Sequence, residues 1–392
     1  MSATVAYVAL DGIHVTNETR VVGGSGATRP RWSADGAWLA YQDDASALWV
    51  VRANGGSARK IADNVHQWEW APRGARIAVT HTDTGQLVVI DLERGGSWTA
   101  PGQVNDFIWS PDGARIAYSV FTAAPVGSRV DDVFVARLDT PERNCVVLCP
   151  DVRKVAFRFG GGGMNGAVDV GVFFAGWSPN GTTLLIWTDG YHSGSIAMDG
   201  LGLHELPVAG GTTRPVTMTL IRRDWIAWSP NGERFATVES TGRTRGDSPR
   251  RIVVCTLATA SCRLIADHAL DPAWSPDGTQ ISFVRADEQP PSNPNGWAVE
   301  YARRTLVVAA TDGTHQQNIH DSSGAASPQW LDNHTILFVH DGGLWIVNQT
   351  TGQHTELNHA IGLPGDVPPP EAYEATDLVG YAWTNSFNVR GR

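Results

Sequence analysis

Short runs of alternating apolar and polar residues recur along the whole chain. One of them is Gln280-Ile281-Ser282-Phe283, and a tryptophan followed by a turn precedes each run. A period of two sends every second side chain to the same face of a β-strand, so each run predicts a strand. The tryptophans that open these units are Trp32, Trp70, Trp109, Trp177, Trp228, Trp274 and Trp330.

The turn after each tryptophan has a consistent chemistry, clearest in Trp109-Ser110-Pro111-Asp112-Gly113. Proline presets φ for the first corner, aspartate or asparagine accepts backbone N–H bonds, and glycine takes the position with φ > 0. The recurring acids of these turns, Asp112 among them, are therefore expected to be turn caps. A single small sheet leaves both faces exposed, so the units are expected to stack on one another.

The repeat Trp-Ser-Pro-Asp-Gly-x-x-Ile-Ala-Tyr/Phe resembles that of the TolB-like propeller family, which is also found in the propellers of prolyl-oligopeptidase-type peptidases. The resemblance implies an all-β fold, a closed β-propeller formed by residues 1–392 as a single domain. The peptidase relatives carry a separate α/β-hydrolase domain. This chain has no such segment, and no Gly-x-Ser-x-Gly nucleophile motif occurs in it.

The number of blades follows from the two ends of the chain. The segment Thr4–Asn17 matches Thr335–Asn348 and lacks only a first strand, while Leu378–Asn385 has the pattern of an isolated first strand. Joining the two ends gives eight four-stranded blades, with the ring closed by the C-terminal strand in the N-terminal blade. This arrangement also removes an exposed sheet edge. The alternative is seven blades with a free C-terminal segment.

Insertions between the predicted strands locate a functional face. With the strands of each repeat named a to d, the a–b and c–d turns lie at one end of a sheet, and the b–c and d–a connections at the other. Long insertions are predicted only in b–c and d–a positions. Because loops on a rigid scaffold concentrate binding and catalysis, this loop-rich face is the predicted functional one. The insertions cover residues 120–131, 158–172, 188–196, 240–250, 285–303 and 359–377.

Candidate ligand contacts fall into two groups. One group lies just ahead of the first-strand tryptophans, where the alternative is a set of solvated residues lining a water-filled channel. The other lies on the insertions, where exposed aromatics are typical of sugar stacking and protein contacts, and arginine suits carboxylates. There the alternative is local packing onto the blade. The candidates are His66, Trp68, Asp106, Asp224 and Asp271 in the first group, and Tyr191, His192, Arg245, Trp297 and Tyr301 in the second.

The charge and hydropathy of the chain limit the classes of partner that it is expected to bind. The formal net charge of −10 argues against nucleic acid, which requires clustered Lys and Arg. No long apolar run predicts membrane insertion. No metal-binding motif is present, so no cofactor is expected. The alternative is a divalent metal held by His and Asp from several repeats. The N-terminal residues lack a signal-peptide pattern, which leaves a cytoplasmic protein or a trimmed periplasmic or secreted one.

The four cysteines form two close pairs. Cys255 and Cys262 end a predicted hairpin and can face each other, so a disulfide and two free thiols both remain open there. Cys145 and Cys149 on one strand would lie about 13 Å apart, too far for a bond without a bend.

Two functions remain. The first is a non-catalytic propeller that binds a protein, peptide or glycan ligand on the loop-rich face, favoured because no catalytic triad, metal motif or cofactor fingerprint occurs. The alternative is a stand-alone propeller enzyme, a lyase or hydrolase, with acid/base residues drawn from several blades at the central mouth.

Overall fold

The computed structural model describes most of the chain as two compact units. Unit 1 comprises Met1–His192, Glu205–Arg214 and Asn385–Arg392, and unit 2 comprises Ser193–His204 and Pro215–Thr384. No helix among the described residues is long and apolar enough to span a membrane. The described residues are 4–9, 11–16, 18, 21–120, 131–138, 151–158, 170–190, 200–239, 250–289, 300–341, 343–358, 361 and 387–390.

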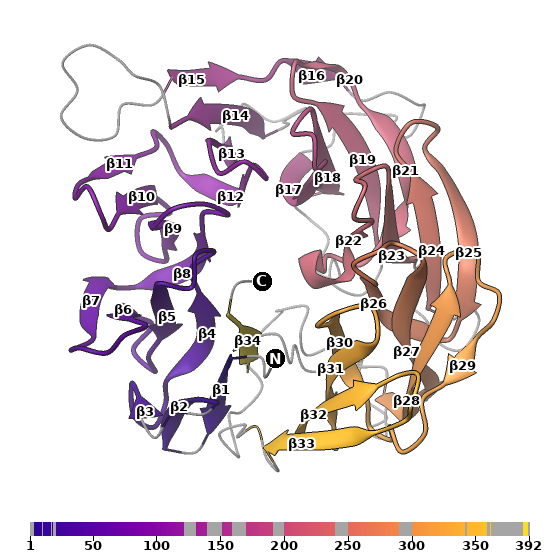
Figure 1. Ribbon diagram of the computed structural model, residues 1–392. Coiled ribbons are helices and arrows are strands. Elements are labelled where there is room, and N and C mark those ends of the chain that lie inside the picture. The colour runs from indigo at the N-terminus through magenta and orange to yellow at the C-terminus, as the bar shows by residue number, and fades with distance from the viewer. Residues whose placement is uncertain are drawn as a thin grey trace. The chain divides into compact units, whose positions relative to one another are not determined.

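Unit 1 contains three consecutive four-stranded sheets, each an antiparallel a–b–c–d repeat (Figure 1). In each of them the repeat tryptophan closes the first strand. The first sheet is β4 (Thr28–Trp32), β5 (Trp38–Gln42), β6 (Leu48–Arg52) and β7 (Arg59–Ala62). The second is β8 (Val65–Trp70), β9 (Arg76–His81), β10 (Leu87–Asp91) and β11 (Ser97–Thr99). The third is β12 (Val104–Trp109), β13 (Arg115–Val120), β14 (Asp132–Arg137) and β15 (Asp151–Lys154).

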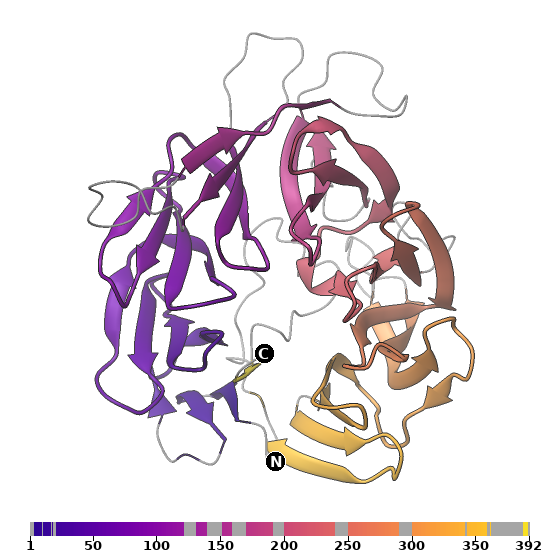
Figure 2. The same cartoon turned by 45° about the horizontal axis from the view of Figure 1, so that its top comes forward.

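The two chain ends share a sheet in unit 1, as the sequence predicts. Its order is β3-β2-β1-β34, and β34 lies beside β1 (Figure 1, Figure 2). The C-terminal strand is Phe387–Val389, not the predicted Leu378–Asn385, which lies outside the described residues. Phe387 and Val389 lie two residues apart and are both buried, so this strand has the alternation of buried side chains expected for the missing first strand. The other strands are β1 (Val5–Ala9), β2 (Gly12–Val15) and β3 (Val21–Val22).

The fifth repeat begins in unit 1 with the antiparallel pair β17 (Val170–Trp177) and β18 (Thr183–Gly190). A short parallel pair, β16 (Phe157–Arg158) and β20 (Gly211–Thr212), also lies in unit 1. The remaining strands of this repeat along the chain are β19 (Leu201–Pro207) and β21 (Arg214–Thr219).

Unit 2 holds the last three repeats. In the first of them, β22 pairs with β23, and the hairpin continues through β24 to β25. Its strands are β22 (Ala227–Trp228), β23 (Arg234–Glu239), β24 (Arg251–Thr256) and β25 (Ser261–Asp267). The second repeat of unit 2 consists of β26 (Ala269–Trp274), β27 (Gln280–Gln289), β28 (Glu300–Ala310) and β29 (Gln317–Asn318). The third consists of β30 (Ala326–Trp330), β31 (Thr335–His340), β32 (Gly343–Asn348) and β33 (His354–Asn358).

These repeated antiparallel sheets are the blades of an all-β propeller, which confirms the predicted fold class. Among the described residues, the N-terminal sheet and the seven tryptophan-headed repeats account for eight repeated units, six of which are separate four-stranded sheets. The assignment of residues 1–392 to a single domain stays a prediction.

The repeat tryptophans connect neighbouring sheets through a recurring hydrogen bond. In five of the seven repeats, the indole Nε1–H donates to the carbonyl of the residue that precedes the tryptophan of the previous repeat. The bonds within unit 1 are Trp70 to Arg31 (3.0 Å), Trp109 to Glu69 (3.3 Å) and Trp177 to Ile108 (3.3 Å). Those within unit 2 are Trp274 to Ala227 (2.8 Å) and Trp330 to Ala273 (3.2 Å).

A second-strand arginine strengthens this contact. The Arg115 guanidinium lies 4.9 Å from the centroid of the Trp177 ring, and its Nη2 donates to the Gly181 carbonyl at 2.9 Å. Arg76 makes the corresponding pair of contacts with Trp109 and Gly113. Cation–π contacts of this kind contribute about 0.5–2 kcal/mol. The residue after Gly-x in the repeat is therefore an inter-sheet contact, which sequence reasoning did not identify.

The turn acids cap their turns, as predicted. Asp277 Oδ1 accepts hydrogen bonds from the Ser275 hydroxyl at 2.6 Å and from the Thr279 backbone N–H at 3.0 Å. These bonds hold the pKa of Asp277 below its ordinary value, the Ser275 bond most of all. Asp112 makes the same two contacts with Ser110 and Ala114.

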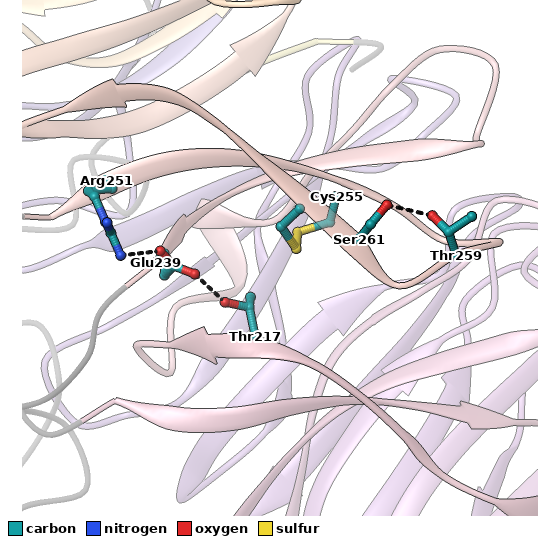
Figure 3. Close-up of a disulfide and its surroundings, with 7 residues drawn as sticks. Thr217, Glu239, Arg251, Cys255, Thr259 and Ser261 are labelled. Atoms are coloured by element: carbon teal, nitrogen blue, oxygen red, sulfur yellow. Dashed lines mark hydrogen bonds and ion pairs between the residues drawn. A yellow bond between two sulfur atoms is a disulfide. The ribbon is translucent and has the colours of Figure 1, made fainter.

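A disulfide joins Cys255 to Cys262, which resolves the alternative left open by the sequence (Figure 3). The two residues are direct partners across β24 and β25, with their Cα atoms 4.0 Å apart. Such close pairs occur at the narrow, non-hydrogen-bonded positions of an antiparallel ladder. Cys145 and Cys149 lie outside the described residues.

Loss of this disulfide should measurably destabilise the fold. The loop-entropy relation gives about 2.5 kcal/mol for a loop of this length, so the double variant Cys255→Ala/Cys262→Ala should lower the free energy of unfolding in urea by about that amount. A reductant should shift the wild-type transition towards that of the variant. Equal shifts by the reductant in both proteins would instead locate the stabilising bond elsewhere.

Candidate functional site

The first strands of the repeats carry most of the candidates ahead of the tryptophans. Several of these strands have a β-bulge near their start, including β8, β12, β26 and β30. A bulge redirects one side chain out of the regular ladder. Asp106 lies at such a bulge in unit 1, and Asp271 at another in unit 2.

Asp106 is buried and binds backbone groups of two strands. Its Oδ1 accepts from the Phe107 N–H at 2.9 Å, and its Oδ2 accepts from the Phe174 N–H of β17 at 2.7 Å. The carboxylate Oδ2 of Asp131, itself 1% exposed, accepts from the Val172 N–H two residues earlier on the same strand. Hydrogen bonds to ionised carboxylates are short and strong, and here they join β12 to β17.

Asp271 has the same role in unit 2, in a strained conformation. It has φ of 52° and directly precedes Pro272, a combination that costs energy for a residue with a Cβ. Its Oδ1 accepts from the Trp225 indole N–H at 2.6 Å, and its Oδ2 accepts from the backbone N–H of Ser327 at 2.9 Å. Ser327, which precedes Pro328, has a positive φ as well. Asp271 therefore links three consecutive repeats.

Asp224 lies in an insertion in the sixth repeat, and this insertion brings it near the Asp271 network. Between Thr219, which pairs with Glu239, and β22, the chain makes an excursion that contains the 3-10 helix η1 (Arg223–Trp225). Trp225 is buried, and its indole reaches Asp271. The excursion replaces the simple bulge of the other repeats.

Arg222 and Asp224 form an ion pair on this excursion. The Arg222 Nε donates to Asp224 Oδ1 at 3.0 Å, and the guanidinium lies 4.5 Å from the centroid of the Trp225 ring. The Arg222 side chain is 5% exposed and that of Asp224 is 25% exposed. The structure thus brings Asp224 and Asp271 into one network through Arg222 and Trp225, two residues that sequence reasoning missed. The sequence did carry a signal for this excursion, because more residues separate the end of β21 at Thr219 from Trp228 than an uninterrupted first strand needs.

The other candidates are dispersed. His66 is exposed on β8, whereas Trp68 on the same strand is 8% exposed and packs in the hydrophobic core with Val50 and Val79. The burial of Trp68 places its ring among apolar side chains, so its contact with a ligand stays a prediction. Tyr301 lies in β28, where its backbone pairs with Glu288. The candidates Tyr191, His192, Arg245 and Trp297 lie outside the described residues.

The strand bounds correct the predicted distribution of insertions. The connection from β14 to β15 covers residues 138–150 and is a long c–d connection, so long insertions are not confined to b–c and d–a positions. Because chain direction reverses at each strand, it leaves its sheet at the end that carries the a–b turn. The predicted insertion 285–303 is also shorter than expected, since β27 and β28 extend to Gln289 and from Glu300.

No group of three or more His, Cys, Asp or Glu side chains that would hold a metal ion occurs among the described residues. The carboxylates of Asp106 and Asp271 bind backbone N–H groups and an indole, and that of Asp224 binds an arginine. The arrangement is suited to holding sheets together.

The repeated sheets and these contacts are those of a β-propeller protein. No protein-family model matches the sequence. The uncharacterized peptidase YuxL of Bacillus subtilis (strain 168) is 41% identical over 61 residues, a match covering 14% of this chain and only 9% of that protein.

Three solved structures are also similar to this chain. The putative TolB of Agrobacterium tumefaciens is 19% identical, with 69% of this chain and 87% of that one covered and a TM-score of 0.36. An oligogalacturonate lyase in complex with manganese is 13% identical, with 81% and 87% covered and a TM-score of 0.49. A puromycin-hydrolyzing peptidase of Mycobacterium tuberculosis is 14% identical, with 88% and 54% covered and a TM-score of 0.48.

Proposed function

We propose that this protein is a non-catalytic, TolB-like propeller that binds a protein or peptide partner. The observation that carries the proposal is the hydrogen bonding of Asp106 and Asp271, the two candidate carboxylates that lie at strand bulges. Both oxygens of each accept hydrogen bonds, and one bond of each, from Phe174 to Asp106 and from Ser327 to Asp271, joins the first strand of the next repeat. A general acid or base needs a carboxylate that can reach a substrate proton.

The lengths of the b–c connections support binding through loops of the middle repeats. They are short after β1, β5, β9 and β31, where strand c begins within a few residues. After four successive second strands they are long, and these four connections include the candidates Tyr191, His192, Arg245 and Trp297. They cover residues 121–131, 191–200, 240–250 and 290–299. Long loops on a rigid scaffold are where binding residues concentrate.

The base of one of these connections is held firmly. Glu239 and Arg251, the residues on either side of 240–250, pair across β23 and β24, with Arg251 Nη2 2.6 Å from Glu239 Oε2 (Figure 3). The Thr217 hydroxyl donates to the other carboxylate oxygen at 2.6 Å. Pre-organisation of this kind lowers the entropic cost of binding.

The test is a peptide-display selection against the immobilised protein, followed by calorimetric titration of the selected peptide. Trp297→Ala and Arg245→Ala should each weaken binding about tenfold or more, as expected for an aromatic or arginine anchor. Leu264→Ala, which removes an exposed side chain from β25, is the matched control and should leave the affinity unchanged.

Two results would contradict the proposal. One is turnover of polygalacturonate or of a peptide substrate, with or without Mn²⁺, that is abolished by Asp106→Asn or Asp271→Asn. The other is selection of peptides whose affinity is the same for all three variants. Retention of a glycan but of no peptide would transfer the proposal to a carbohydrate ligand.

A further inference from the structure

The last described residues, 387–390, form an extended segment docked at the edge of the N-terminal sheet. Three backbone pairs join it to β1: Val5 with Val389, Ala6 with Asn388, and Tyr7 with Phe387. The Arg390 N–H adds a hydrogen bond to the Thr4 carbonyl at 2.9 Å. Phe387 and Val389 are 1% and 3% exposed, so one side of the segment is buried in the core.

The other two side chains reach the neighbouring sheet. Asn388 Oδ1 accepts from the backbone N–H of Trp32 at 2.8 Å. Arg390 Nε donates to the Gly36 carbonyl at 2.8 Å, and its guanidinium lies 5.2 Å from the centroid of the Trp32 ring. Two side chains of the segment are therefore buried and the other two make specific contacts, a pattern suited to sequence-selective recognition of an extended peptide.

Comparison with other sheets shows what this segment replaces. Arg390 contacts Trp32 and Gly36 as Arg115 contacts Trp177 and Gly181. In the sheets β8–β11 and β12–β15, that arginine (Arg76 or Arg115) belongs to the second strand of a continuous repeat. Here it comes from the end of the chain, and the inter-sheet contact is contained in four consecutive residues.

Only residues 359–386 connect this segment to the preceding strand, β33. A covalent connection of that length contributes to docking through effective concentration, which declines as the connection lengthens. The contacts themselves are ones that a separate peptide can make.

We infer that the edge of β1 and the adjoining end of β4 form a strand-docking site for a peptide with the sequence Phe-Asn-Val-Arg. The chain's own C-terminal segment fills this site, and the same segment from a second copy of the chain binds there when the resident copy is withdrawn. Such exchange of an identical element is a recognised route to association between copies.

The test uses the full chain with a protease site inserted between residues 370 and 371. The protein is folded, cleaved and examined by native mass spectrometry and size exclusion. The cleaved C-terminal piece should stay bound, and mixing with an isotope-labelled cleaved copy should exchange the pieces. Asn388→Ala and Arg390→Ala should each increase its dissociation constant about tenfold, because each leaves a buried or aromatic partner without its contact.

A second measurement determines whether the site is specific. A fluorescent peptide of residues 386–392 should bind the chain truncated after Ser386 and bind the uncut full chain at least tenfold more weakly, since the site is then filled. Two results would overturn the inference. One is release of the wild-type piece as fast as the variant pieces, and the other is equal binding of the peptide by the truncated chain and the uncut full chain. If the truncated chain does not fold, the cleavage experiment decides alone.

Discussion

Replacement of Trp109 with alanine should lower the free energy of unfolding by about 3–5 kcal/mol, the range for truncation of a buried aromatic. Trp109 is 4% exposed and packs with Ala71, Val89 and Ile116 in the core between two sheets of unit 1. The substitution also removes the indole N–H bond to the Glu69 carbonyl and the surface on which Arg76 stacks. Urea or thermal unfolding followed by tryptophan fluorescence or circular dichroism measures the change.

The phenylalanine variant separates the two contributions. Trp109→Phe keeps an aromatic ring in the core but loses the N–H bond, so it should cost less than the alanine variant, by about 1–2 kcal/mol relative to wild type. Trp98, a half-buried residue on the outer strand β11, is a control of the same chemistry, and Trp98→Phe should change stability by less than about 1 kcal/mol. Equal costs for Trp109→Phe and Trp109→Ala would mean that the hydrogen bond, not the packing, dominates.

The fold was predictable because its information is local and repeated. Pro111, Asp112 and Gly113 determine a turn by themselves, and the alternation that follows determines which side chains face the neighbouring sheet. Each additional copy of the unit repeats that evidence. The C-terminal strand was placed a few residues too early because Leu378–Asn385 and Phe387–Val389 both alternate. What distinguishes them is the contact of Asn388 with Trp32, a residue at the other end of the chain.

The candidate site was less predictable because it depends on distant contacts. Asp106 and Asp271 were identified from their position ahead of a tryptophan, but their partners Phe174 and Ser327 belong to the next repeat along the chain. Nothing in the local sequence states that a carboxylate there binds a backbone N–H and not a ligand.

A weaker sequence signal for these roles does exist. Arg29, Asp271 and Ser327 each precede a proline that lies two residues before a repeat tryptophan, and all three have positive φ. The motif x-Pro-x-Trp therefore marks a first strand whose bulge is strained, which is a structural and not a catalytic signature.

Replacement of Asp106 with alanine should lower the free energy of unfolding by about 2–4 kcal/mol. The substitution leaves two buried backbone N–H groups, those of Phe107 and Phe174, without the acceptor that holds β12 to β17. Each unsatisfied buried donor costs about 1–3 kcal/mol. Urea denaturation measures the loss, and His66→Ala, at an exposed position on β8, is the control that should stay within about 0.5 kcal/mol of wild type.

The asparagine variant distinguishes a structural carboxylate from a reactive one. Asp106→Asn keeps one acceptor oxygen of the same geometry, so it should retain part of the stability lost in the alanine variant. If Asp106 serves only to join the two strands, the affinity for a ligand will follow the fraction of folded protein in the wild type, the alanine variant and the asparagine variant. If Asp106 is instead an acid or base, the asparagine variant will be stable yet inactive, because a neutral amide cannot exchange the proton that catalysis requires. Full stability of the alanine variant would show that the bond from Phe174 to Asp106 does not contribute to stability.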